Sequence, residues 1–130
     1  MNIVMIGTGY VGLTSGLGFA SLGNRVACVD TDATKIAKLD LGQAPFFEPD
    51  LEEQLKALQE NGQIVFTTDL ESVIDGAQVL MIAVQTPPQS NGQADLSYLE
   101  SVAEQIGKLL DHEALVVVKS TVPVGTNRHV

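Results

Sequence analysis

The sequence predicts an α/β fold in which a doubly wound, mostly parallel sheet carries helices on both faces. The observations behind this class are short apolar runs, helical patterns between the runs, and glycine-rich or polar turns at the junctions. Continuous apolar runs of this length are typical of strands buried on both faces of a sheet. Strands that alternate with helices favour right-handed crossovers and parallel pairing.

Five runs rich in Val, Ile and Leu are the expected strands. None of them alternates cleanly between apolar and polar residues, so each is expected to be covered on both faces. The runs are Asn2 to Ile6, Arg25 to Val29, Ile64 to Thr67, Val79 to Val84 and Ala114 to Lys119.

Helical patterns fill the intervals between these runs. Tyr10 to Leu22 is expected to be a helix that Gly23 closes in a left-handed conformation. Another helix is expected from about Leu51, with Pro49 and Asp50 in its first turn, where a proline and an acid are favoured.

A further helix is expected to start at an N-cap formed by Asp95. Its apolar stripe consists of Leu96, Leu99, Val102, Ala103, Ile106 and Leu110. Thr34 to Leu41 and Leu70 to Ile74 are shorter helical candidates. The one long irregular connection, Gln85 to Ala94, follows the end of a strand, which is where open α/β sheets bind ligands.

The composition indicates one folded domain over residues 1 to 130 in a reducing, cytoplasmic setting. The net charge of -9 argues against nucleic acid and membrane surfaces as partners, and no apolar stretch approaches the length of a membrane span. The single cysteine, Cys28, excludes an internal disulfide and a cysteine cluster, and we expect no metal site.

A glycine motif follows the first expected strand and opens the first expected helix. Gly7, Gly9 and Gly12 form G-x-G-x-x-G, and Asp30 ends the next strand about 18 residues later. The first glycine permits a tight turn, the second lets the backbone approach a pyrophosphate, and the third lets helix and strand pack closely. This context predicts a dinucleotide-binding (Rossmann) domain, with FAD enzymes and methyltransferases as the alternatives that share such a loop.

Asp30 indicates which dinucleotide is bound. A carboxylate there accepts hydrogen bonds from the adenosine ribose and repels a 2′-phosphate, which favours NAD over NADP. Lys35 follows closely enough to cover the same ribose or the adenine side, although a lone lysine is more often a solvated helix residue.

Four stretches of the chain resemble the N-terminal domain of the UDP-glucose and GDP-mannose dehydrogenase family. They occur in the order of that family and cover essentially the whole chain. The stretches are Gly7-Thr8-Gly9-Tyr10-Val11-Gly12-Leu13, Pro45-Phe46-Phe47-Glu48-Pro49-Asp50-Leu51, Val84-Gln85-Thr86-Pro87-Pro88 and Lys119-Ser120-Thr121-Val122-Pro123-Val124-Gly125-Thr126. The last stretch is similar to the branch that acts on UDP-glucose, whereas the GDP-mannose branch tends to depart from it near Pro123.

The resemblance implies NAD contacts from the backbone of Tyr10 and Val11, from Asp30 and Lys35, and from Thr86 and Thr121. It also implies that the residue matching Thr121 lies near the reacting centre and positions water or substrate. Judged without the family, Thr86 and Thr121 are equally typical of side chains that hydrogen-bond their own turns.

The reaction implied is the oxidation of UDP-glucose to UDP-glucuronate with two NAD, through a nucleophilic cysteine. Cys28 lies in an expected core strand and is the wrong cysteine, so that nucleophile, with the substrate domain, is expected beyond Val130. The fragment alone is expected to be inactive and monomeric, and the full enzyme a homodimer. The rivals are a dehydrogenase of GDP-mannose or of an N-acetylated UDP-sugar, and a non-catalytic NAD/NADH-sensing domain.

Overall fold

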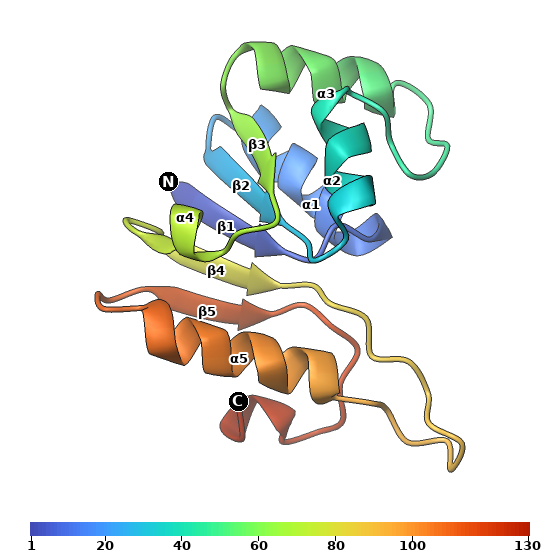
Figure 1. The fold of residues 1–130 in the computed structure, drawn as a ribbon, viewed down its shortest axis with the longest axis vertical. Coiled ribbons are helices and arrows are strands. Elements are labelled where there is room, and N and C mark those ends of the chain that lie inside the picture. Colours follow the sequence, from blue (N-terminus) through green and yellow to red (C-terminus); the bar gives the residue numbers. More distant parts are fainter.

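A computed structural model describes residues 1–130 and contains one five-stranded sheet whose strands all run parallel (Figure 1). The strands are β1 (Asn2–Ile6), β2 (Arg25–Val29), β3 (Ile64–Thr67), β4 (Val79–Ile82) and β5 (Leu115–Val118). Their order is β3-β2-β1-β4-β5, so the chain winds outward from the central β1 in one direction and then in the other. The predicted doubly wound class is confirmed, and the order reverses beside β1.

The helices are α1 (Tyr10–Ser21), α2 (Ala33–Asp40), α3 (Leu51–Glu60), α4 (Glu71–Ile74) and α5 (Ser97–Leu109), followed by a 3-10 turn over Thr126–Arg128. Figure 1 shows α1, α2 and α3 on one side of the sheet and α5 on the other. Gly23 adopts a φ of 89° just after α1, as the sequence predicts. No helix is long and apolar enough to cross a membrane.

Two hydrophobic clusters cover the two faces of the sheet. Within β1, Ile3 and Met5 belong to one cluster, with α1, α2 and α3, while Val4 and Ile6 belong to the other, with α4 and α5. Successive side chains of a strand point to opposite faces, so a continuous apolar run is what a sheet with two covered faces requires.

The outer strands are less buried than the sequence analysis expected. On β3, Val65 is 50% exposed, and on β5, Leu115 is 61% exposed. Two strands are also shorter than predicted, because β4 leaves the sheet after Ile82 and β5 is limited to Leu115–Val118. An apolar run does not show whether its strand has one neighbour or two, so sequence overestimates the burial of edge strands.

Four helix starts differ from prediction by a residue or two; α2 and α4 are shifted by one residue, and α5 and α3 differ at their caps. The cap of α5 is Leu96, although the Asp95 carboxylate still accepts a hydrogen bond from the Ser97 N–H at 3.0 Å. Pro49 and Asp50 precede α3 rather than filling its first turn, and Asp50 is the cap residue at a φ of 63° with no side-chain capping bond. The left-handed turn at Asp50 delays the helix, and capping acids tolerate such a turn better than most residues.

Candidate functional site

The glycine loop between β1 and α1 is built around two close backbone contacts. Gly7 has a φ of +101°, and a Cβ there would lie 2.5 Å from the Ala83 carbonyl oxygen. A Cβ on Gly12 would lie 1.9 Å from the carbonyl oxygen of Gly7. Any side chain at either position displaces the backbone, so these glycines hold the loop against β4 and α1.

Gly9 differs because a Cβ built there would meet no atom within 4 Å. Its φ of -69° is open to any residue, so folding does not require a glycine here. A side chain at Gly9 would instead fill the open space beside the start of α1. Without one, a ligand group can approach the backbone there, and we call this open space the cradle.

The start of α1 is free to bind an anion. Gly9 caps the helix without a side-chain hydrogen bond, and the first turn contains no acidic residue. The first N–H groups of a helix have no partner within the helix, and the helix dipole is positive at this end. The arrangement suits a phosphate or pyrophosphate despite the acidic surface of the molecule.

Asp30 lies beside this loop, at the carboxyl end of β2, and is held there by four donors. Its Oδ2 accepts from the Thr8 N–H at 2.9 Å, from the Thr8 hydroxyl at 2.6 Å and from Lys35 Nζ at 3.2 Å. Its Oδ1 accepts from the Asp32 N–H at 3.0 Å. Burial alone raises the pKa of the Asp30 carboxyl, but these bonds outweigh burial and lower the pKa, so the group is ionised.

The position of Lys35 follows from the start of α2. The Asp32 side chain caps this helix by accepting bonds from the N–H groups of Thr34 and Lys35. Lys35 therefore sits in the first turn, and its ammonium group reaches back to Asp30. Capping thus places a cation and an anion side by side at the end of β2.

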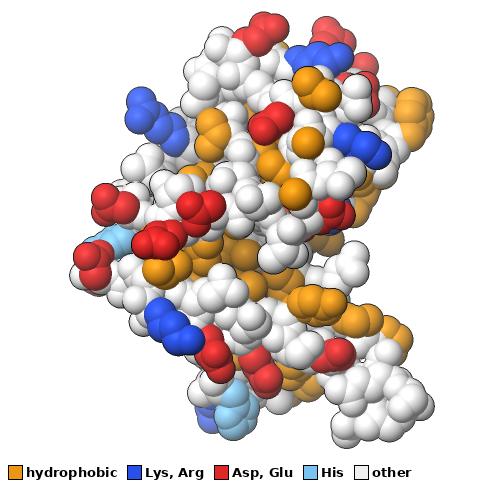
Figure 2. Space-filling view, in the orientation of Figure 1, with side chains coloured by type: hydrophobic (Ala, Val, Ile, Leu, Met, Phe, Trp, Pro, Cys, Tyr) orange, Lys and Arg blue, Asp and Glu red, His pale blue; other side chains and the backbone are white.

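These groups line a crevice of about 260 Å³ at the carboxyl ends of the central strands. The side of the molecule toward which those strand ends point is hollowed in Figure 2. Its lining residues come from five regions: the glycine loop, the end of β2 with the start of α2, the segment after β3, the end of β4 and one face of α5. Those most relevant to binding are Gly7, Thr8, Gly9, Asp30, Lys35, Leu70, Gln85, Tyr98, Ser101 and Gln105. This is the location at which open α/β sheets bind ligands.

The structure brings some of the predicted site residues together and leaves others apart. Gly7, Gly9, Asp30 and Lys35 line the crevice, and Gly12 supports the loop from below. Tyr10 and Val11 are exposed at the start of α1, with the Tyr10 ring 5.0 Å from that of Phe46. Neither Thr86 nor Thr121 lines the crevice.

Thr86 and Thr121 instead contact one another beyond the ends of β4 and β5. The Thr86 hydroxyl donates to the Thr121 carbonyl at 2.6 Å, and the Ser120 hydroxyl donates to the Val84 carbonyl at 2.7 Å. These reciprocal bonds tie together two segments that are far apart in the sequence. The sequence left open that the Thr86 hydroxyl bonds within its own turn. In the structure it bonds the segment after β5 instead.

Sequence reasoning missed two parts of this site. Thr8 is a spacer in the motif, yet it is fully buried and supplies two of the four donors to Asp30. Tyr98, Ser101 and Gln105 line the crevice from α5. Their spacing of three and four residues marks one face of a helix, so a search for a polar face beside the apolar stripe would have found them.

Other reactive side chains lie outside the crevice. Cys28 is fully buried, and burial raises the pKa of its thiol to about 12, which confirms it as an inert core residue. The His112 ring nitrogens contact the Ala77 carbonyl and the Asp111 carboxylate, away from the crevice. No group of three His, Cys, Asp or Glu side chains is arranged to hold a metal ion.

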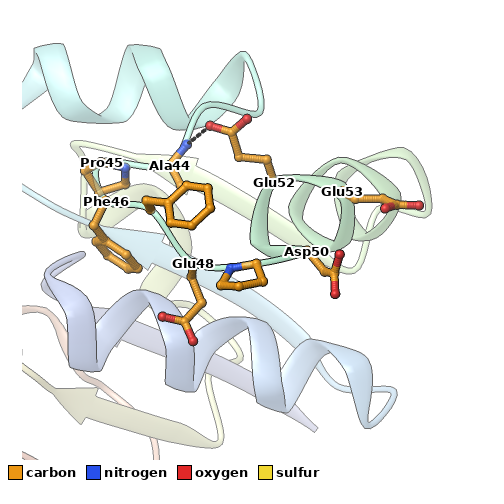
Figure 3. A pocket seen from close by; sticks show the side chains of 9 residues that line it. Ala44, Pro45, Phe46, Glu48, Asp50, Glu52 and Glu53 are labelled. Carbon is orange, nitrogen blue, oxygen red and sulfur yellow. Dashed lines mark hydrogen bonds between the residues drawn. The ribbon is translucent and has the colours of Figure 1, made fainter.

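A larger hollow of about 630 Å³ lies between the Ala44 to Asp50 loop and the start of α3 (Figure 3). Its lining includes Glu48, Asp50, Glu52 and Glu53 but no basic residue, and Glu52 accepts a bond from the Ala44 N–H at 3.1 Å. Four carboxylates repel an anionic ligand. The smaller crevice beside the glycine loop is therefore the better site for a phosphate-bearing ligand.

Known proteins resemble this chain over its whole length. The model of the NAD binding domain of the UDP-glucose/GDP-mannose dehydrogenase family matches residues 1–130. A UDP-glucose 6-dehydrogenase of Rhizobium meliloti is 47% identical over 131 residues, which are 100% of this chain and 30% of that protein. One from Bacillus subtilis is 44% identical over 127 residues, or 98% of this chain and 29% of that protein.

A solved structure extends the similarity to the fold. The GDP-mannose dehydrogenase of Pseudomonas aeruginosa, solved as a ternary complex, superposes with a TM-score of 0.95 at 36% identity. The match covers 100% of this chain and 30% of that one. The chain thus spans about 30% of the length of the proteins it matches, and the match lies in their cofactor-binding part.

Proposed function

Because the chain belongs to the UDP-glucose/GDP-mannose dehydrogenase family as its NAD-binding domain, we propose that it serves an enzyme that oxidises UDP-glucose to UDP-glucuronate with two NAD. The observation that carries the proposal is the crevice between the glycine loop and Asp30, in a chain that this family's domain model matches from end to end. NAD, when bound, supplies the hydride acceptor for the oxidation.

The residues around the crevice fit NAD in a definite orientation. The open space above Gly9 and the free N–H groups of Tyr10 and Val11 suit the pyrophosphate. Asp30 and Lys35 suit the adenosine ribose, since an ionised carboxylate accepts from ribose hydroxyls and repels a 2′-phosphate. This orientation accounts for an anionic cofactor on a chain of net charge -9.

The opposite end of the cofactor would lie toward the tied segments after β4 and β5. Thr86 and Thr121 are linked there, and we assign them to the nicotinamide side. Thr121 is exposed, so its hydroxyl is available to position water or substrate. Cys28 takes no part in the chemistry, because it is buried in the core with a raised pKa.

The choice of UDP-glucose rests on the sequence relatives and on one segment. The relatives from Rhizobium meliloti and Bacillus subtilis are UDP-glucose 6-dehydrogenases, and the segment from Lys119 to Thr126 resembles that branch. GDP-mannose is the second candidate, because the solved GDP-mannose dehydrogenase superposes over the whole chain. We place the enzyme in the cytoplasm, as a homodimer acting on a free nucleotide sugar.

The test is the amount of NADH formed per sugar consumed by the full gene product, with UDP-glucose and GDP-mannose in parallel. Two NADH per UDP-glucose support both the four-electron oxidation and the substrate. Turnover of GDP-mannose alone would retain the family and overturn the choice of sugar. No NADH from any nucleotide sugar, together with NAD binding in a calorimetric titration, would favour a regulatory NAD-sensing domain.

A further inference from the structure

Thr8 is a polar residue in a place where the glycine motif specifies none. It lies between Gly7 and Gly9, and its side chain is fully buried. Its hydroxyl and its N–H both donate to Asp30 Oδ2, at 2.6 and 2.9 Å. Burying a hydroxyl is costly unless it is hydrogen-bonded, and the Asp30 carboxylate is the partner that satisfies this one.

The donors around Asp30 are divided unequally between its two oxygens. Oδ2 accepts three bonds, two from Thr8 and one from Lys35, whereas Oδ1 accepts only the bond from the Asp32 N–H. A carboxylate oxygen has two lone pairs, so Oδ2 is saturated and Oδ1 retains acceptor capacity. The side chain of Asp30 is 13% exposed, so little water competes for that capacity.

Of these donors, Thr8 is the one suited to fix the carboxylate. Its side chain is short, branched at Cβ and packed without exposure, so few rotamers are open to it. The side chain of Lys35 is 28% exposed and has a long flexible stem, so its ammonium group can follow the carboxylate wherever it turns. Without the Thr8 hydroxyl, Oδ2 keeps only the Thr8 N–H and the flexible Lys35 ammonium group as donors, so the carboxylate is held less tightly.

We propose that Thr8 is a positioning residue that sets the preference for NAD over NADP, by holding Asp30 with its free oxygen toward the adenosine ribose. This inference rests on the NAD site assigned above. A held carboxylate accepts from the 2′-hydroxyl of NAD and repels the 2′-phosphate of NADP. A carboxylate held less tightly accepts less well from the 2′-hydroxyl and repels the 2′-phosphate less. The variant therefore weakens NAD binding without weakening NADP binding.

The experiment replaces Thr8 with Val, which keeps the shape and the N–H bond but removes the hydroxyl, and with Ser, which restores the hydroxyl. Thr14→Val is the matched control, because the Thr14 hydroxyl bonds only backbone carbonyls of α1. Calorimetric titration of the intact protein with NAD and with NADP gives the ratio of the two dissociation constants. A charge-assisted hydrogen bond is worth roughly a tenfold change in affinity, or somewhat more.

We expect Thr8→Val to weaken NAD binding about tenfold while NADP binding changes less than about twofold. Thr8→Ser and Thr14→Val should keep the wild-type ratio. In an Asp30→Asn background, Thr8→Val should no longer change the ratio, because the effect acts through the Asp30 carboxylate.

An unchanged ratio in Thr8→Val would overturn the inference while leaving NAD binding intact. Equal losses for both cofactors, with a lower melting temperature, would show instead that Thr8 only fastens the loop. If Thr8→Val does not fold, Thr8→Ala is titrated in the same way, and an unchanged ratio of the two dissociation constants would overturn the inference as well. A wild-type protein that binds neither cofactor would refute the NAD site itself.

Discussion

Gly9 and Gly12 belong to one motif, but only at Gly12 does the structure itself require glycine. At Gly12 a Cβ would collide with the Gly7 carbonyl oxygen, so the requirement comes from folding. At Gly9 a Cβ would meet nothing and the backbone is relaxed, so the proposed reason for a glycine there is the approach of the ligand. Replacing each glycine with alanine therefore separates stability from binding.

Gly9→Ala should leave the free energy of unfolding within about 0.5 kcal/mol of wild type and weaken NAD binding at least tenfold. Gly12→Ala should lower that free energy by about 3 kcal/mol, because backbone must shift around the new methyl group. Gly18→Ala is the control, since its Cβ also meets no atom but faces away from the crevice on exposed α1 surface. Urea unfolding and calorimetry measure the two quantities, and undiminished NAD binding in Gly9→Ala would contradict the assignment of the cradle.

At the scale of the elements, the sequence predicted the bounds of three strands and extended the other two, β4 and β5, too far. Strands β1, β2 and β3 begin and end where the apolar runs do, because their ends are marked by glycine, asparagine or aspartate. The run from Val79 to Val84 continues beyond β4, since its last residues line the crevice while still being apolar. An apolar residue that faces a ligand site has the same sequence signal as one that faces the core.

The candidate site was predictable where it rests on local sequence and missed where it rests on contacts between distant residues. The glycine loop and Asp30 follow from a motif with known spacing. The hydroxyl bonds from Thr8 to Asp30, and from Thr86 to the Thr121 carbonyl, join residues 22 and 35 positions apart. Which residues form such bonds depends on how the strands pack side by side, and this cannot be inferred from a single sequence.

One contact between elements gives a pH-dependent prediction. The His112 ring, in the turn between α5 and β5, contacts the Ala77 carbonyl just before β4 at 2.9 Å, and Asp111 at 3.2 Å. The bond to the Ala77 carbonyl, with help from Asp111, raises the pKa of His112 above its ordinary value of 6.5. A raised folded-state pKa means that folding favours the protonated ring.

The stabilisation from His112 should be fully present below pH 6.5 and should disappear as the pH rises through the raised pKa. The free energy of unfolding of wild type should therefore fall across that window relative to that of His112→Gln, which retains hydrogen bonding without the charge. Urea unfolding of both proteins at a series of pH values gives the difference. A difference that does not vary with pH would show that His112 contributes no charge to this contact.

For the whole molecule, the excess of acidic residues acts against the compact state through repulsion between like charges. Sixteen acidic residues face seven basic ones, and only Lys35 and Lys108 form lysine-carboxylate pairs. The pair of Lys108 with Glu104 is largely exposed and contributes little. On the face that Figure 2 shows, red acidic side chains outnumber the blue basic ones, so neighbouring charges there are mostly of like sign.

Screening should therefore stabilise this protein. Raising NaCl from about 0.01 M to about 0.15 M shortens the Debye length from about 30 Å to about 8 Å, which weakens repulsion among many acids and few attractive pairs. The melting temperature should rise, and the rise should be smaller for Asp40→Lys with Glu60→Lys, which changes the net charge from -9 to -5 at the exposed ends of α2 and α3. A melting temperature that falls with salt in wild type would mean that attractive pairs outweigh the repulsion that its composition implies.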